Sequence, residues 1–159
     1  MSEDARSGFW ITNRVANPVV RRLLRNPLGR RLGRRLALVR YRGRRTGREY
    51  ELPVQYVRDD ARVWIVPAFP ERKTWWRNLR GGADVELHLA GQDLRGRGVA
   101  LEGPEQADEV VEGLAAYLTA SPRTRKAFGL AAAETTTAAD DDVLQLSQRT
   151  VVIRVDLEP

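Results

Sequence analysis

Two short motifs in this chain contain residue types that can bind an anionic ligand with a ring. The segment 41–48 reads YRGRRTGR, and the segment 72–79 reads RKTWWRNL. Guanidinium groups, a hydroxyl and the backbone N–H groups of a glycine-containing turn suit phosphate oxygens, and a tryptophan offers a flat wall to an aromatic ring. Together the motifs predict a ligand with a phosphate at one end and a planar ring at the other, as in a flavin-type cofactor.

Each motif also has a purely structural interpretation. An arginine-rich turn can be a solvated hairpin loop, and tryptophans in a short helix can pack against a core. Adjacent residues of a helix point about 100° apart, so no more than one of Trp75 and Trp76 is expected to face a ligand. Tyr56 has two interpretations as well, because a phenol can donate a hydrogen bond to a developing oxyanion or line a barrel.

The composition excludes several kinds of catalytic site. The 159 residues contain no cysteine and one histidine, His88. Disulfides, thiolate metal sites and a cysteine nucleophile are therefore excluded, as are most histidine metal sites and the usual serine–histidine–aspartate triad. We predict no metal ion and interpret His88 as a surface or barrel-lining residue. A cofactor that carries the chemistry would need neither residue type.

The positive charge is concentrated in the first third of the chain. Residues 1–48 contain fourteen arginines and two acidic residues, a net charge of +12, whereas residues 49–159 carry −6. Such a basic segment can contact an anionic membrane surface, a polyanionic small molecule or nucleic acid. Nucleic acid is the least expected of these partners, because no helix-turn-helix, zinc-finger or ribonucleoprotein motif is visible.

The sequence also bears on location. No apolar run approaches the roughly 18 residues of a membrane span, and the N-terminus lacks the apolar core of a signal peptide. We therefore predict a cytoplasmic protein, with its basic arm available for peripheral contact with the inner face of the membrane.

The length of 159 residues predicts one domain, 1–159, and the residue pattern predicts a basic helical arm at 1–35 and a barrel at 36–159. Strand-like segments, the first of which alternates apolar and basic residues from Leu38 onward, predict about six antiparallel strands: 36–42, 49–57, 61–66, 85–89, 94–101 and 150–157. A short helix is expected at 75–80, a longer one at 104–118 before the last strand, and a loop at 129–142. This pattern is typical of a mainly β protein, a small β-barrel with helices.

Residues 36–101 resemble the deazaflavin (F420)-dependent nitroreductase and oxidoreductase family. The resemblance rests on the turn at 43–48, on Leu52-Pro53-Val54 followed by Tyr56, and on the segment 75–79 followed by Val85. It implies a split β-barrel of the kind that also occurs in FMN-binding flavin reductases.

The resemblance implies which residues bind the cofactor. The phosphate of F420 is expected at the turn, and the deazaflavin ring is expected at the end of the following strands, with Trp75 as its wall. The expected cofactor-binding residues are Arg44, Arg45, Thr46, Gly47, Arg48, Pro53, Tyr56, Pro67, Ala68, Lys73, Trp75 and Asn78. Tyr56 is also the expected catalytic residue.

The implied reaction is hydride transfer from reduced F420 to a small organic acceptor such as a quinone, an enone or a nitro-compound. Two alternatives stay open. One is an FMN-dependent reductase with the same barrel, and the other is a non-catalytic barrel that holds a lipid, a tetrapyrrole or another ligand. Similar barrels often pair, so a homodimer is expected by analogy.

Overall fold

The computed structural model describes residues 17–27, 34–130, 136–137 and 139–159. In chain order the elements are α2 (Asn17–Arg25), β1 (Leu36–Arg42), β2 (Glu49–Gln55), β3 (Val57–Asp59), β4 (Arg62–Ile65), the 3-10 helix η4 (Trp75–Leu79), β5 (Ala83–Leu89), β6 (Gln92–Glu102), α3 (Ala107–Ala120), α4 (Pro122–Ala127), α5 (Asp141–Ser147) and β7 (Val151–Leu157).

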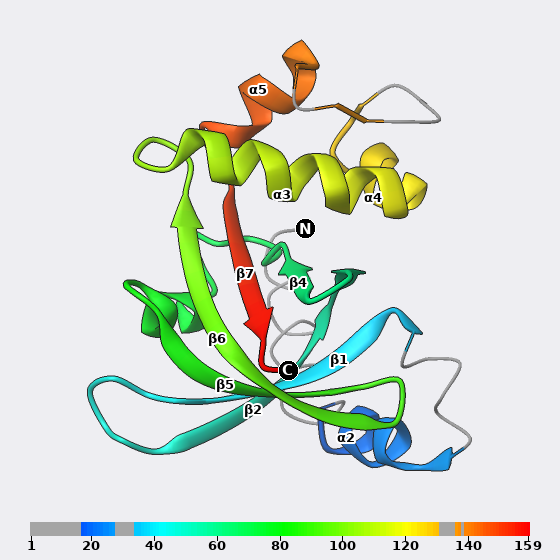
Figure 1. Ribbon diagram of the computed structural model, residues 1–159, viewed down its shortest axis with the longest axis vertical. Coiled ribbons are helices and arrows are strands. Elements are labelled where there is room, and N and C mark those ends of the chain that lie inside the picture. Colours follow the sequence, from blue (N-terminus) through cyan, green and yellow to red (C-terminus); the bar gives the residue numbers. More distant parts are fainter. Residues whose placement is uncertain (1–16, 28–33, 131–135, 138) are drawn as a thin grey trace, which may run out of the picture.

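The strands form one antiparallel sheet that is strongly curled. Their order is β2-β1-β5-β6-β7-β4-β3, so β2 and β3 lie at opposite ends of the sheet. Only Tyr56 separates the end of β2 from the start of β3. Because two residues span at most about 7 Å, the sheet must curl until its end strands meet. Figure 1 shows this curvature in β6, which bends across the molecule.

The predicted fold class is confirmed, with one difference in the strands. The molecule is mainly β with several helices, and its sheet is a split barrel. The described part of the chain has seven strands instead of about six, because the predicted strand 49–57 is divided at Tyr56. The backbone N–H of Tyr56 leaves the sheet pairing and donates to the carbonyl of Arg35 over 3.2 Å.

Neighbouring residues of β4 belong to two different apolar clusters. Val63 and Ile65 face the barrel interior, whereas Trp64 between them packs with α3. In β7, Val152 likewise faces α3 between interior-facing neighbours. Successive side chains of a strand point to opposite faces, so a nearly continuous apolar run indicates a strand that is covered on both sides.

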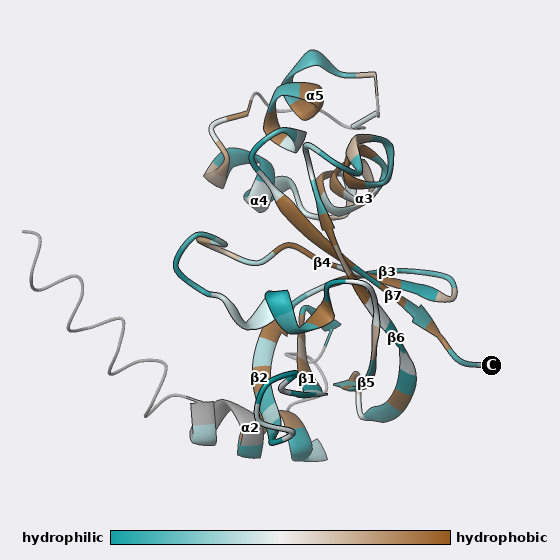
Figure 2. Cartoon of the chain, turned by 90° about the vertical axis from the view of Figure 1, so that its left-hand side faces the viewer, coloured by the Kyte–Doolittle hydropathy of each residue, from teal (hydrophilic) through white to brown (hydrophobic). Residues whose placement is uncertain are grey.

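The helices lie at two ends of the molecule. Figures 1 and 2 show α3, α4 and α5 grouped at one end and α2 at the opposite end, below β1 and β2. The helix predicted at 104–118 is α3, and α5 was not predicted. The acidic residues expected in a loop at 140–142 lie at the start of α5, where negative charge favours a helix. Val143 and Leu146 of α5 are buried.

The predicted basic arm is described only in part. α2 belongs to it and packs against β1 and β2. Residues 1–16 and 28–33 of the arm lie outside the described residues. Of the helices that the structure describes, none combines the length and the apolar character needed to cross a membrane.

Candidate functional site

The structure brings the two sequence motifs together. The turn at 43–48 joins β1 to β2, and the second motif forms η4 with the loop before it. The backbone N–H of Arg44 donates to Oδ1 of Asn78 over 2.9 Å. The Nδ2 atom of Asn78 donates in turn to the carbonyl of Trp75 over 2.8 Å. One asparagine therefore holds the arginine turn beside the helix that carries Trp75.

The turn itself is closed by hydrogen bonds. The N–H of Gly43 donates to the carbonyl oxygen of Arg48, and the N–H of Gly47 donates to the carbonyl oxygen of Gly43. Both donor–acceptor distances are 2.9 Å. Gly47 has a φ of 66°, a conformation that favours glycine. The hydroxyl oxygen of Thr46 accepts from the N–H of Arg48 over 3.3 Å. The glycines and the threonine thus define a compact turn.

The arginines of the turn keep their charge available. Arg44, Arg45 and Arg48 are exposed, and no carboxylate among the described residues pairs with their guanidinium groups. Arg42, just before the turn, differs because its guanidinium lies 3.5 Å from a carboxylate oxygen of Glu49. Three uncompensated guanidinium groups on one short turn form a site suited to phosphate oxygens.

A row of aromatic rings runs from the turn to η4. The ring of Tyr41 stacks on that of Tyr50, with centroids 5.6 Å apart and an interplanar angle of 20°. The centroid of the Tyr41 ring also lies 5.8 Å from that of the Trp75 ring. Burial, with a smaller contribution from Tyr50, raises the pKa of Tyr41 to about 12, so its phenol stays neutral. Trp75 is half-buried and Trp76 is buried in the barrel interior.

Tyr41 and Tyr50 were missing from the predicted site. The hairpin register contained the signal, because the two residues lie directly opposite each other across the turn. Aromatic pairs at such positions interact through their rings. Reading the turn together with its flanking strands would therefore have added both tyrosines to the site.

The loop between β4 and η4 contains three of the predicted residues. Pro67 is buried, Ala68 is exposed and Lys73 is half-buried. Burial lowers the pKa of Lys73. Phe69, which follows Ala68, has a φ of 53°, and its carbonyl accepts from the N–H of Lys73 over 2.9 Å. Trp76 also anchors this loop, because its indole N–H donates to the carbonyl oxygen of Pro70 at a distance of 2.9 Å.

Pro53 and Tyr56 lie further along β2 from the turn. Pro53 is half-buried and pairs with Leu38 of β1. Tyr56 is buried in the barrel interior beyond the end of β2, and burial raises its pKa. At about 3.3 Å per strand residue, Tyr56 lies roughly 25 Å along the chain path from Arg48. The predicted residues that belong to this hairpin therefore spread along it, with the arginines at one end and Tyr56 just past the other.

A cavity lies next to the two residues that flank the turn, Arg42 and Glu49. β1 and β5 pair only over Leu38–Arg40 and Glu86–His88, and the strands diverge beyond Arg40. The cavity between them has a volume of about 570 Å³, and its lining includes Tyr41 and Arg42. Arg42 and Glu49, which flank the arginine turn, therefore border this cavity.

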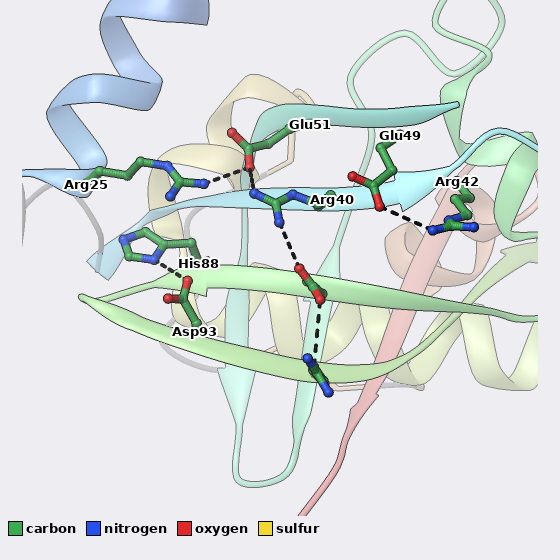
Figure 3. A network of polar contacts seen from close by, with 9 residues as sticks. Arg25, Arg40, Arg42, Glu49, Glu51, His88 and Asp93 are labelled. Carbon is green, nitrogen blue, oxygen red and sulfur yellow. Dashed lines mark hydrogen bonds and ion pairs between the residues drawn. The ribbon is translucent and has the colours of Figure 1, made fainter. Parts of the chain in front are cut away.

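Ion pairs on the outer face of the sheet attach α2 to the barrel (Figure 3). Glu51, whose side chain is 6% exposed, lies 3.0 Å from both Arg25 of α2 and Arg40 of β1. His88 forms a second contact with α2. Its Nδ1 atom lies 2.7 Å from a carboxylate oxygen of Asp93, and its Nε2 atom lies 3.2 Å from the carbonyl oxygen of Leu24. These groups satisfy one another, so we interpret the network as structural.

Comparison with known proteins gives one family and a set of similar folds. Residues 19–128 match the sequence model of the family described as F420H(2)-dependent quinone reductase. No curated protein matches the chain.

Three solved structures have similar folds. An F420-H2 dependent reductase (FDR-A) matches with a TM-score of 0.52 and 16% identity, over 77% of this chain and 94% of that one. A protein described as a domain-swapped dimer matches with a TM-score of 0.51 and 16% identity, over 77% and 80%. The protein Atu2129 of Agrobacterium tumefaciens matches with a TM-score of 0.51 and 18% identity, over 84% and 57%. At these identities the likeness shows the fold alone.

Proposed function

Because the chain belongs to the F420H(2)-dependent quinone reductase family, we propose that it transfers a hydride from reduced F420 to a quinone. Family membership makes it an F420-dependent oxidoreductase, and the identity of the acceptor is the proposed part. Enones and nitro-compounds are the further acceptors to test, since both accept a hydride at an electron-poor carbon or nitrogen.

One observation carries the assignment to particular residues. Asn78 joins a turn with three uncompensated arginines to the helix that bears Trp75. A phosphate-binding element and an aromatic wall are thereby held at a fixed separation. This arrangement fits a ligand that has a phosphate group at one end and a planar ring at the other.

Each group of residues has a stated role in the proposal. Arg44, Arg45 and Arg48 bind the phosphate, with the hydroxyl of Thr46 and the backbone of Gly47 completing the turn. Trp75 lies against the ring, and Asn78 positions both elements. The bound cofactor supplies the hydride, so the protein contributes binding, orientation and electrostatics.

The ring would occupy the space bordered by the strand ends and the β4–η4 loop. Pro53, Pro67 and Ala68 offer apolar contacts there, and Lys73 offers a positive charge beside them. Burial lowers the pKa of Lys73, which makes its ammonium group readier to give up a proton. Tyr56 is proposed as a hydrogen-bond donor to the acceptor, since its raised pKa keeps the phenol protonated.

We also propose that α2 contributes to contact with an anionic membrane surface. Arg22 is exposed, and the neighbouring Leu23 is 43% exposed. Exposed arginine beside an exposed apolar side chain is typical of helices that lie on anionic lipid. Such a position would bring the enzyme to lipid-soluble quinones.

A homodimer is a separate proposal, which the neighbour described as a domain-swapped dimer motivates. Light scattering of the purified protein tests it.

The proposed function is tested by titrating tryptophan fluorescence with F420 and, separately, with FMN. We expect saturable quenching by F420 and weaker quenching by FMN. Replacing Arg44, Arg45 and Arg48 together with alanine should weaken F420 binding at least a hundredfold, because charge-assisted hydrogen bonds are among the strongest. The matched control replaces Arg123, Lys126 and Arg149, which are exposed and lie in or beside α4 and α5.

The two triple variants remove the same charge, so only a local effect of the turn separates them. Equal affinity in both would contradict the phosphate site. Reduction of menadione by reduced F420, followed by absorbance, then tests the acceptor. Stronger binding of FMN than of F420 would favour an FMN-dependent reductase, and binding without any reduction would favour a non-catalytic barrel.

A further inference from the structure

Tyr50 is an exposed aromatic residue that contacts the arginine turn from its own hairpin. It lies on β2, two residues after Arg48, and is 41% exposed. Its ring stacks on buried Tyr41, which in turn contacts Trp75. One face of this exposed ring is therefore held by a buried partner.

The phenol of Tyr50 reaches back to the turn. Its hydroxyl oxygen lies 3.3 Å from the hydroxyl oxygen of Thr46. Thr46 also accepts from the backbone N–H of Arg48 over 3.3 Å. A hydroxyl has one donor and two acceptor positions, so Thr46 can make both bonds at once. Tyr50 is thereby linked to Arg48 through Thr46.

The ring also fills the space above Gly43. A Cβ atom at that glycine would lie 2.9 Å from Cε2 of Tyr50 and 2.9 Å from the hydroxyl oxygen of Thr46. Such distances leave no room for a side chain. The turn is therefore closed against the ring and does not extend freely into solvent.

We propose that Tyr50 is a positioning residue that fixes the shape of the phosphate-binding turn. The turn has two anchors: Asn78 holds Arg44 on one side, and Tyr50 holds Thr46 on the other. With both in place the three arginines are displayed on a preformed turn. Without Tyr50 the turn must be ordered when phosphate binds, and that ordering reduces affinity.

This inference rests on the proposed function, because it assumes that the turn binds the phosphate of F420. Its test compares F420 with the phosphate-free ribityl deazaflavin, which carries the same ring. Tyr50→Leu should bind F420 about tenfold more weakly, since a few side chains must be ordered on binding. Its affinity for the ribityl deazaflavin and its kcat at saturating F420 should stay unchanged. Tyr50→Phe, which keeps the ring, should lose no more than about threefold.

Two controls make the result specific. Gln55→Ala changes another exposed residue of β2, at its far end, and should leave both affinities unchanged. Amide hydrogen exchange, measured without ligand, should be faster at Gly47 and Arg48 in Tyr50→Leu than in the wild type, because both amides take part in the turn.

The possible failures are distinguishable. If the wild type binds no F420, the proposed function fails, and unchanged hydrogen exchange in Tyr50→Leu would then overturn the positioning role as well. If Tyr50→Leu loses equal affinity for F420 and the ribityl deazaflavin, Tyr50 contacts the ring directly and the inference is wrong. Unchanged F420 affinity in Tyr50→Leu also overturns it.

Discussion

The backbone N–H of Arg44 donates to the side-chain oxygen of Asn78 over 2.9 Å, across 34 residues of sequence. The nitrogen of the same side chain donates to the carbonyl of Trp75. A carboxamide suits this place because it is both a donor and an acceptor. A single side chain therefore sets the distance between the arginine turn and the helix beside it.

Asn78→Ala should destabilise the protein and weaken F420 binding. It removes two hydrogen bonds, each worth about 1 kcal/mol, so urea unfolding should show a loss of about 2 kcal/mol. Asn78→Asp keeps the acceptor for Arg44 and should recover about half of that stability. It should not recover affinity, because it adds a negative charge beside the proposed phosphate site. Unchanged F420 affinity in the alanine variant would contradict the link between the two elements.

Glu51→Gln should loosen α2. The carboxylate of Glu51 pairs with Arg25 and Arg40 while its side chain is almost fully buried, and removing its charge leaves Arg40 without one of its partners. We expect a loss of about 2 kcal/mol in urea unfolding, in the range for a broken hydrogen bond to a charged group. Trypsin should cleave faster at Arg22 and Arg25.

Glu49→Gln is the matched control for this variant, because the Glu49 pair with Arg42 is exposed. Exposed ion pairs contribute at most about 1 kcal/mol. Equal protease sensitivity of the two variants would show that the Glu51 network does not hold α2.

Tyr56→Phe separates a chemical role from a packing role. If the phenol donates to the acceptor, kcat should fall roughly a hundredfold, which is the lower end of the rate loss expected when a general acid is removed. F420 affinity should stay the same. Stopped-flow absorbance of F420 oxidation measures the rate. A variant with full kcat and lower stability would assign Tyr56 to the barrel core alone.

Gly113→Ala should destabilise the contact between α3 and the barrel. A Cβ atom there would lie 2.7 Å from the ring of Trp64 and 2.7 Å from a methyl group of Val152. Overpacking of this kind costs about 1–3 kcal/mol, although alanine favours helices more than glycine does. Thermal unfolding followed by circular dichroism measures the loss. A more stable variant would mean that α3 can move away from the sheet at little cost.

Tyr117 should make the protein sensitive to alkaline pH. Burial raises its pKa from 10.0 to about 12, so the folded state favours the neutral phenol. The neutral phenol makes its full contribution to the free energy of unfolding below pH 10. This contribution decreases as pH rises toward 12, and at pH 11 it should be smaller by roughly 1.4 kcal/mol than at neutral pH. Urea unfolding at pH 9 and pH 11 measures this change. Tyr117→Phe should lose less stability over the same interval, and an equal loss would contradict the assignment.

The sequence allowed the local elements of the candidate site to be predicted better than the contacts between them. The arginine turn and the tryptophan helix were identified from residue types and spacing, and both form where expected. The bond from Arg44 to Asn78 could not be predicted, because it joins segments whose approach depends on the whole sheet.

Strand ends and short helices were also harder to predict. The division at Tyr56 follows from the curling of the sheet, which brings β3 to the opposite end of the strand order from β2, and no glycine marks the break in the sequence. α5 has only seven residues, too few for a helical period to stand out beside its alanine- and threonine-rich neighbours.

β7 occupies the middle of the sheet, between β6 and β4, although it follows every other strand in the chain. During synthesis the hairpins β1–β2 and β5–β6 can form as they leave the ribosome, but β4 and β6 wait for the strand that joins them. At ordinary rates of translation that interval lasts about ten seconds. Apolar strand edges are then open to pairing with other chains, so we expect the nascent protein to depend on a chaperone that binds unfolded segments.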